Sequence, residues 1–163
     1  MIPQNTKKQI FVSIVRPLSN YCSTLWFYAN KNTTNQLQLI YNQAMRMILK
    51  ADWDAPIVNM PKKLEWLTVE ENVYLDVMVF LYKMDQGILP EYMKLAPRFS
   101  EVHNYNTRNQ QNYNIAQKRK SWRKSIYEEG LSEYNDLPTD VKCATNIKSF
   151  KILLINKIKR DRQ

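Results

Sequence analysis

Residues 68–87, TVEENVYLDVMVFLYKMDQG, predict a long helix whose two ends are both marked in the sequence. Thr68 and Glu71 have the spacing of a capping box, in which each side chain accepts a hydrogen bond from the other residue's backbone N–H. Gly87 supplies the left-handed conformation that ends many helices. Between these ends, apolar residues recur every three or four positions, so we expect a strongly apolar helix over about 69–86. Its core face consists of Val73, Val77, Phe80, Leu81 and Met84.

The same periodicity predicts two helices before this stretch. Residues 4–16 place Ile10, Phe11 and Ile14 together, and Pro17 is expected to end that helix. Residues 18–29 are aromatic and apolar and are expected to be buried. A helix over about 35–50 follows, which Thr33 or Thr34 can cap. Its apolar stripe consists of Leu37, Ile40, Tyr41, Ala44, Met47 and Ile48.

Five segments are predicted after Gly87. We expect a turn of helix from Pro90 to Leu95, a looped Asn-rich segment over 97–116, and a basic helix over 118–127. Residues 131–138 have the composition of turns. A last amphipathic helix is expected over about 146–160, with Thr145 as its cap. Its inward face consists of Ile147, Phe150, Leu153, Leu154 and Ile158.

The scarcity of glycine decides the fold class. Two glycines in 163 residues argue against sandwiches and barrels, which need many tight turns, and exclude Gly-rich phosphate loops. The sequence therefore predicts a mainly α protein: an irregular helical bundle with an Asn-rich extended loop and a basic C-terminal helical segment. We expect residues 1–100 to form the bundle. Residues 101–163 either form a small module or, as their few aliphatic residues favour, pack on the bundle.

The net charge of +9 is concentrated toward the C-terminus. Residues 1–100 have a formal charge of +3, whereas the shorter segment 101–163 has +6. Five cations fall within residues 118–124, where Trp122 either anchors a helix in the core or stacks on a base. A solvated surface without a partner is the alternative. The predicted nucleic-acid-binding residues are Arg108, Lys118, Arg119, Lys120, Trp122, Arg123 and Lys124.

Several chemistries lack the residues that they need. His103 is the only histidine, and Cys22 and Cys143 are far apart, so neither a nucleophile with its base nor a zinc site is indicated. Asp52 and Asp54 are more typical of a solvated loop than of a metal site. We expect no enzyme activity, no cofactor, no metal and no small-molecule substrate. Without a long apolar run we also expect no membrane span and an intracellular protein, nuclear or cytoplasmic.

Three short motifs follow one another in the C-terminal half. His103–Arg108 reads HNYNTR, Asn135–Pro138 reads NDLP, and Ser149–Lys151 reads SFK. Their order and spacing resemble the C-terminal, thumb and post-thumb region of reverse transcriptases from non-LTR (LINE-type) retrotransposons. Tyr134 stands where a tryptophan is usual in that family.

The resemblance extends over nearly the whole chain. Residues 8–26 are similar to the region that follows the palm in that family, and residues 39–48, LIYNQAMRMI, are similar to a helix of the same region. Residues 81–92, which include Leu81, Gly87 and Pro90, resemble a segment that follows this helix in the family. Each motif is loose by itself, and their common order carries the resemblance.

The resemblance implies a part of a polymerase that grips nucleic acid and performs no catalysis. Such polymerases hold magnesium with paired aspartates, and this chain has no Asp-Asp pair. The expected ligand is RNA template or RNA–DNA duplex, and the expected partners are the polymerase palm and fingers of a longer protein. The alternatives are a co-opted helical protein-interaction module, or a remnant with no independent function.

Overall fold

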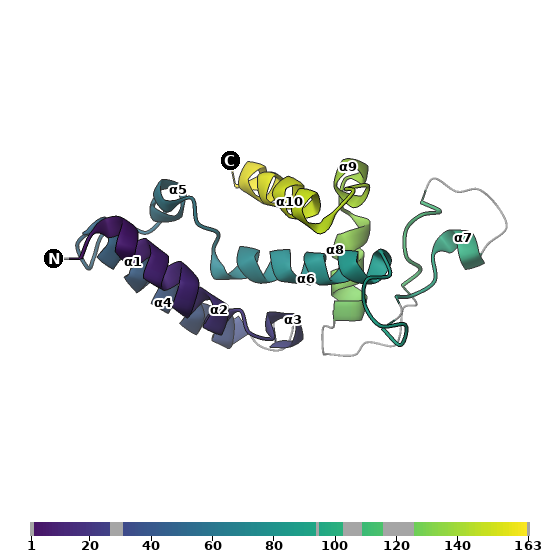
Figure 1. The fold of residues 1–163 in the computed structure, drawn as a ribbon, viewed down its shortest axis with the longest axis horizontal. Coiled ribbons are helices and arrows are strands. Elements are labelled where there is room, and N and C mark those ends of the chain that lie inside the picture. Colours follow the sequence, from purple (N-terminus) through teal and green to yellow (C-terminus); the bar gives the residue numbers. More distant parts are fainter. Residues whose placement is uncertain (1, 27–30, 94, 103–108, 116–125, 163) are drawn as a thin grey trace. The chain divides into compact units, whose positions relative to one another are not determined.

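The computed structural model describes residues 2–26, 31–93, 95–102, 109–115 and 126–162 (Figure 1). These residues are mainly helical, which confirms the predicted fold class. The helices are α1 (Gln4–Ile10), α2 (Arg16–Ser19), α3 (Ser23–Trp26), α4 (Lys31–Leu49), α5 (Met60–Leu64), α6 (Val69–Asp85), α7 (Phe99–Val102), α8 (Leu131–Asn135), α9 (Thr139–Lys142) and α10 (Ile147–Asp161). Two π-helical turns, Phe11–Val15 and Ile126–Gly130, lead into α2 and α8.

The chain divides into two compact units, Met1–Tyr74 and Leu75–Gln163. The boundary lies within α6, so this helix contributes its first turn and a half to the first unit and its remainder to the second. The predicted boundary near residue 100 lies inside the second unit and stays a prediction.

Both predicted ends of α6 are present. The Thr68 backbone N–H donates to Glu71 Oε2 at 2.7 Å, and the Glu71 N–H donates to Thr68 Oγ1 at 3.2 Å. At the other end Gly87 has φ +65°, and the Ile88 N–H reaches back to the Lys83 carbonyl at 2.9 Å. These bonds satisfy backbone groups that a helix end leaves without partners, so the boundaries of α6 are set locally.

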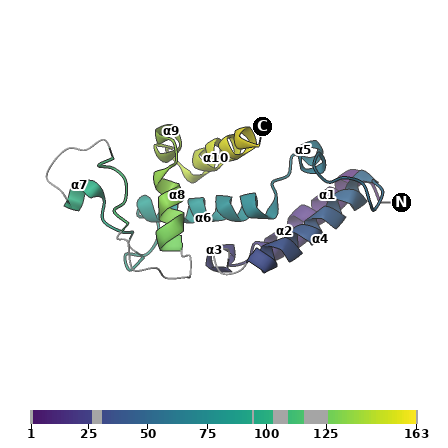
Figure 2. The same ribbon diagram turned by 180° about the vertical axis from the view of Figure 1, so that it is seen from behind.

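The first unit is built around Phe11. Its ring stacks on Trp66 at a centroid distance of 4.6 Å and meets Tyr41 edge-on at 4.9 Å. In Figures 1 and 2, α1 and α2 run alongside α4, which brings these rings together. Arg16 donates to Asn72 Oδ1, a contact that ties α2 to α6 inside this unit.

Pro17 does not end the first helix, contrary to the prediction. It lies in the first turn of α2, directly after the π-helical turn. A proline ring clashes with the carbonyl four residues earlier in a regular α-helix, and the wider π turn relieves that clash. The helix therefore continues to Ser19.

The predicted burial of residues 18–29 is wrong for the described residues Leu18, Tyr21 and Leu25, which are all exposed. Tyr21 keeps 78% of its surface accessible. The reason is that the helix ends at Ser19 and Cys22 takes a left-handed φ of 52°, which turns α3 away from the line of α2.

The apolar stripe of α4 is only half buried. Tyr41, Met45 and Ile48 face inward, whereas Ile40 and Met47 are exposed on its flank. The predicted stripe is offset from the buried face, because it left out the buried Met45 and included the exposed Ile40 and Met47. The exposed flank is one wall of a groove described below.

The second unit packs α10 against the rest of α6. Tyr82 stacks on Phe150 at 4.3 Å, and its hydroxyl donates to the Ala144 carbonyl at 2.6 Å. The predicted inward residues Phe150, Leu154 and Ile158 are buried. The predicted cap is wrong: Asn146, and not Thr145, accepts the Ser149 N–H at 2.8 Å.

The connecting segments differ from prediction in detail. Residues 131–138, predicted as turns, contain α8, and Pro90 begins a turn rather than a helix. In the Asn-rich segment, Arg98 and Tyr113 form an antiparallel bridge, and Phe99–Val102 is a short helix. The described part of this segment is therefore a loop closed at its base, in agreement with the loop expected there.

Candidate nucleic-acid interface

The residues predicted to bind nucleic acid lie outside the described residues. They are Arg108, Lys118, Arg119, Lys120, Trp122, Arg123 and Lys124, and His103 lies outside as well. The structure does describe the residues on either side of these segments, and those residues converge on one place in the second unit.

That place is the carboxylate of Asp85, at the end of α6. Arg98 Nη2 donates to Asp85 Oδ1 at 2.5 Å, the Tyr113 hydroxyl donates to the same oxygen, and the Tyr134 hydroxyl donates to Oδ2 at 3.1 Å. The Arg98 guanidinium also lies 5.3 Å from the centroid of the Tyr113 ring. We call Asp85, Arg98, Tyr113 and Tyr134 the Asp85 cluster. It joins α6, both sides of the Asn-rich loop, and α8.

Asn135, the first residue of the NDLP motif, continues this network. Its side chain accepts the Tyr113 N–H at 2.9 Å and donates to the Tyr113 carbonyl at 3.0 Å, as a neighbouring β-strand would. Lys142 Nζ donates to the Asn135 carbonyl at 2.7 Å and to Asn112 Oδ1 at 3.3 Å. The motif residue thus fastens the returning side of the loop to α8.

Burial fixes the protonation of these groups. Burial and the hydrogen bond to Asp85 raise the pKa of Tyr113 to about 12, and the same two causes, with the charge of Asp85, raise the pKa of Tyr134. Burial alone would lower the pKa of Arg98, but its bonds to Tyr113 and Asp85 raise the pKa overall. Burial lowers the pKa of Lys142. At neutral pH both hydroxyls therefore keep their protons and donate to Asp85.

A hollow of about 370 Å³ lies beside the cluster, and Asp85, Arg98, Asn135 and Lys142 are among its lining residues. The hydrogen bonds given above already join these four residues to one another or to Tyr113. The hollow is therefore a gap between segments that are already hydrogen-bonded to one another. These bonds hold the Asn-rich loop in place.

A second basic surface, which the sequence reasoning missed, lies on α10. Its exposed cations are Lys148, Lys151, Lys159 and Arg160, which we call the α10 basic face. All four are exposed, whereas Phe150 and Leu154 of the same helix are buried. The signal that could have revealed them from the sequence is that none of them belongs to the predicted inward face of this helix. Lys157 differs, because it pairs with Asp161 at 2.8 Å.

No three His, Cys, Asp or Glu side chains of the described residues lie close enough together to hold a metal ion. Every described helix is too short or too polar to cross a lipid bilayer. Comparisons of the chain with protein-family models, with curated proteins and with solved structures find no match.

Proposed function

We propose that this chain is a non-catalytic segment of a retrotransposon-derived RNA-directed DNA polymerase, and that its second unit binds RNA template or RNA–DNA duplex. The observation that carries the proposal is the α10 basic face, four exposed cations on the helix that buries Phe150, Leu154 and Ile158. The motifs that resemble the reverse transcriptase family supply the identity of the parent.

The chemistry of the ligand follows from the charge. A phosphate backbone is recognised mainly by lysine and arginine, and each neutralised phosphate releases condensed counterions. Lys148 and Lys159 are eleven residues apart, which is about 16 Å along a helix and spans several phosphates of one strand. Residues 118–124 add five cations to the same unit.

The Asp85 cluster supports the proposal by its position in the chain. In the sequence, Arg108 stands between Arg98 and Tyr113, and residues 118–124 stand between Tyr113 and Tyr134. Each predicted binding segment therefore stands between two residues of the cluster along the chain. In this proposal Asn135 of the NDLP motif holds Tyr113, and the catalytic aspartates belong to a palm that a longer parent supplies in the nucleus or cytoplasm.

The test is charge reversal on the α10 basic face. We predict that Lys148→Glu with Lys151→Glu and Lys159→Glu weakens binding to an RNA–DNA duplex at least tenfold at low salt, measured by fluorescence anisotropy. The matched control reverses three exposed cations of the first unit, Lys50, Lys62 and Lys63, and so changes the net charge equally.

The control variant is expected to lose much less affinity than the α10 variant. Equal losses in the two variants would mean that net charge alone drives binding, and an unchanged affinity of the α10 variant would refute the proposed surface. Circular dichroism of both variants checks that the helices are retained.

A further inference from the structure

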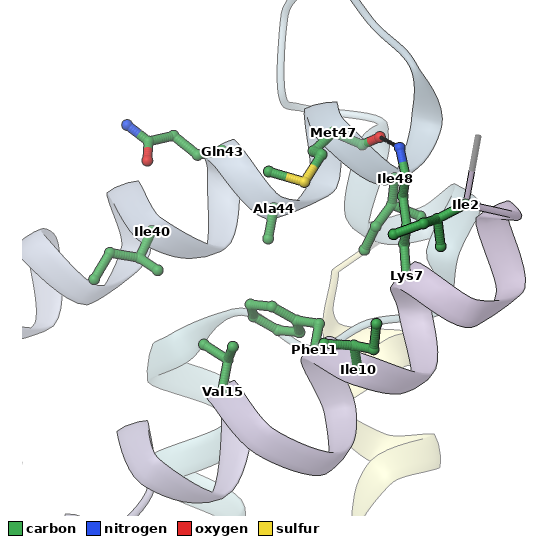
Figure 3. A pocket seen from close by; sticks show the side chains of 10 residues that line it. All are labelled: Ile2, Lys7, Ile10, Phe11, Val15, Ile40, Gln43, Ala44, Met47 and Ile48. Atoms are coloured by element: carbon green, nitrogen blue, oxygen red, sulfur yellow. Dashed lines mark hydrogen bonds between the residues drawn. The ribbon is translucent and has the colours of Figure 1, made fainter.

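The first unit has an open apolar groove between its first helix and α4. Figure 3 shows Ile40, Ala44 and Met47 of α4 facing Ile10, Phe11 and Val15 across it. The groove holds about 360 Å³, and its surface is almost entirely carbon. Phe11 and Ile48, both buried, connect it to the core.

The side chains that line the groove leave much apolar surface exposed to solvent. Ile40 is 49% exposed and Met47 is 64% exposed, and Ile2 and Ile10, which also line the groove, are exposed as well. Single exposed aliphatic residues are ordinary on a protein surface, but a contiguous set that lines one concavity is typical of an interaction site. The concave shape suits a ridge of side chains, as one helix presents to another.

The charge of the groove walls indicates which kind of partner helix would bind there. The two helices that form its walls, α1 and α4, contain lysine and arginine residues but no Asp or Glu. Lys7 lines the groove, and its Nζ donates to the Met47 carbonyl at 3.4 Å. A second copy of this positive surface would be repelled, whereas acidic side chains beside an apolar ridge would be attracted.

We propose that the groove receives an acidic amphipathic helix of a partner protein, with apolar side chains at i, i+4 and i+7 in the groove and Asp or Glu toward Lys7. The aliphatic walls offer a nucleic acid no exposed ring for stacking, because the Phe11 ring packs on Trp66 and Tyr41. A flat lipid bilayer would not fill a concave groove. The site is separate from the nucleic-acid surface of the second unit and does not depend on it.

The test uses a labelled synthetic peptide of about 18 residues, or about five helical turns, with Leu at the ridge positions and Glu or Gln elsewhere. Its binding to the whole chain is measured by fluorescence anisotropy. Two comparison peptides are a scramble of the same composition and a version with Lys in place of Glu. We expect only the acidic amphipathic peptide to bind.

Three variants locate the binding. Ile40→Glu in the groove wall is expected to weaken binding of the acidic peptide about tenfold, and Lys7→Glu is expected to weaken it several-fold. The matched control is Leu39→Glu, because Leu39 is the neighbour of Ile40 on α4, is also exposed to solvent and does not line the groove. It is expected to bind within about twofold of the unaltered chain.

The proposal is overturned if the acidic peptide fails to bind, if the scramble binds equally, or if Leu39→Glu weakens binding as much as Ile40→Glu. Sedimentation and vesicle flotation complete the test. A dimer, or binding to anionic vesicles, that Ile40→Glu abolishes would assign the groove to a second copy or to a membrane surface instead.

Discussion

Asp85 is the residue that holds both sides of the Asn-rich loop and α8 together in the second unit. Its side chain is 8% exposed and accepts hydrogen bonds from three segments, through Arg98, Tyr113 and Tyr134. We predict that Asp85→Ala lowers the free energy of unfolding by ~3 kcal/mol, because it leaves a guanidinium and two hydroxyls without their acceptor. Urea denaturation measures this. The control Asp54→Ala, at an exposed carboxylate, is expected to change it by less than ~0.5 kcal/mol.

Tyr113 makes the free energy of unfolding fall as the pH rises above 10.0. Its pKa is raised from 10.0 to about 12 in the folded chain, so the unfolded chain loses this proton first as the pH rises. The stabilisation is therefore complete below pH 10.0 and is lost toward about pH 12, a change of ~2–3 kcal/mol. Urea denaturation across this range measures it. Tyr113→Phe should show a shallower decline, and an equal decline in both proteins would contradict the assignment.

The sequence could predict the residues whose roles are local. Thr68, Glu71 and Gly87 act within one turn of their own helix, so their spacing alone identified them. Asp85 could not be identified in this way, because its partners lie 13, 28 and 49 residues away. Only the fold brings them together.

Helix α10 shows how a boundary is decided by one side chain. Thr145 and Asn146 are both residues that cap helices, and Asn146 is the one that accepts the Ser149 N–H. We predict that Asn146→Ala lowers the free energy of unfolding by ~1 kcal/mol and Thr145→Ala by much less. Thermal or urea denaturation of the two variants measures the difference. The reverse order would show that the predicted cap, Thr145, is the working one.

Helix α4 shows where periodicity stops being informative. The 3.6-residue repeat identified the helix and two of its buried residues, Tyr41 and Ile48. It could not tell which half of a wide apolar stripe faces the core, since that depends on where Phe11 and Trp66 lie. The exposed remainder, with Ile40 and Met47, became the groove wall.

At the scale of the whole molecule, two surfaces of different chemistry belong to the two units. The first unit carries an apolar groove among cations, and the second carries the α10 basic face and the segments that the Asp85 cluster holds. The excess charge after residue 100 pointed to the second surface in the sequence. The groove left no such signal, because exposed and buried aliphatic residues look alike in a sequence.

If the chain grips a phosphate backbone, its affinity for nucleic acid must fall as salt is added. We predict that the logarithm of the binding constant for an RNA–DNA duplex falls linearly with the logarithm of the potassium chloride concentration, with a slope that reports several phosphate contacts. Lys120→Glu with Arg123→Glu and Lys124→Glu should reduce that slope by up to about three. No binding at low salt, or a slope that the triple variant leaves unchanged, would contradict the claim.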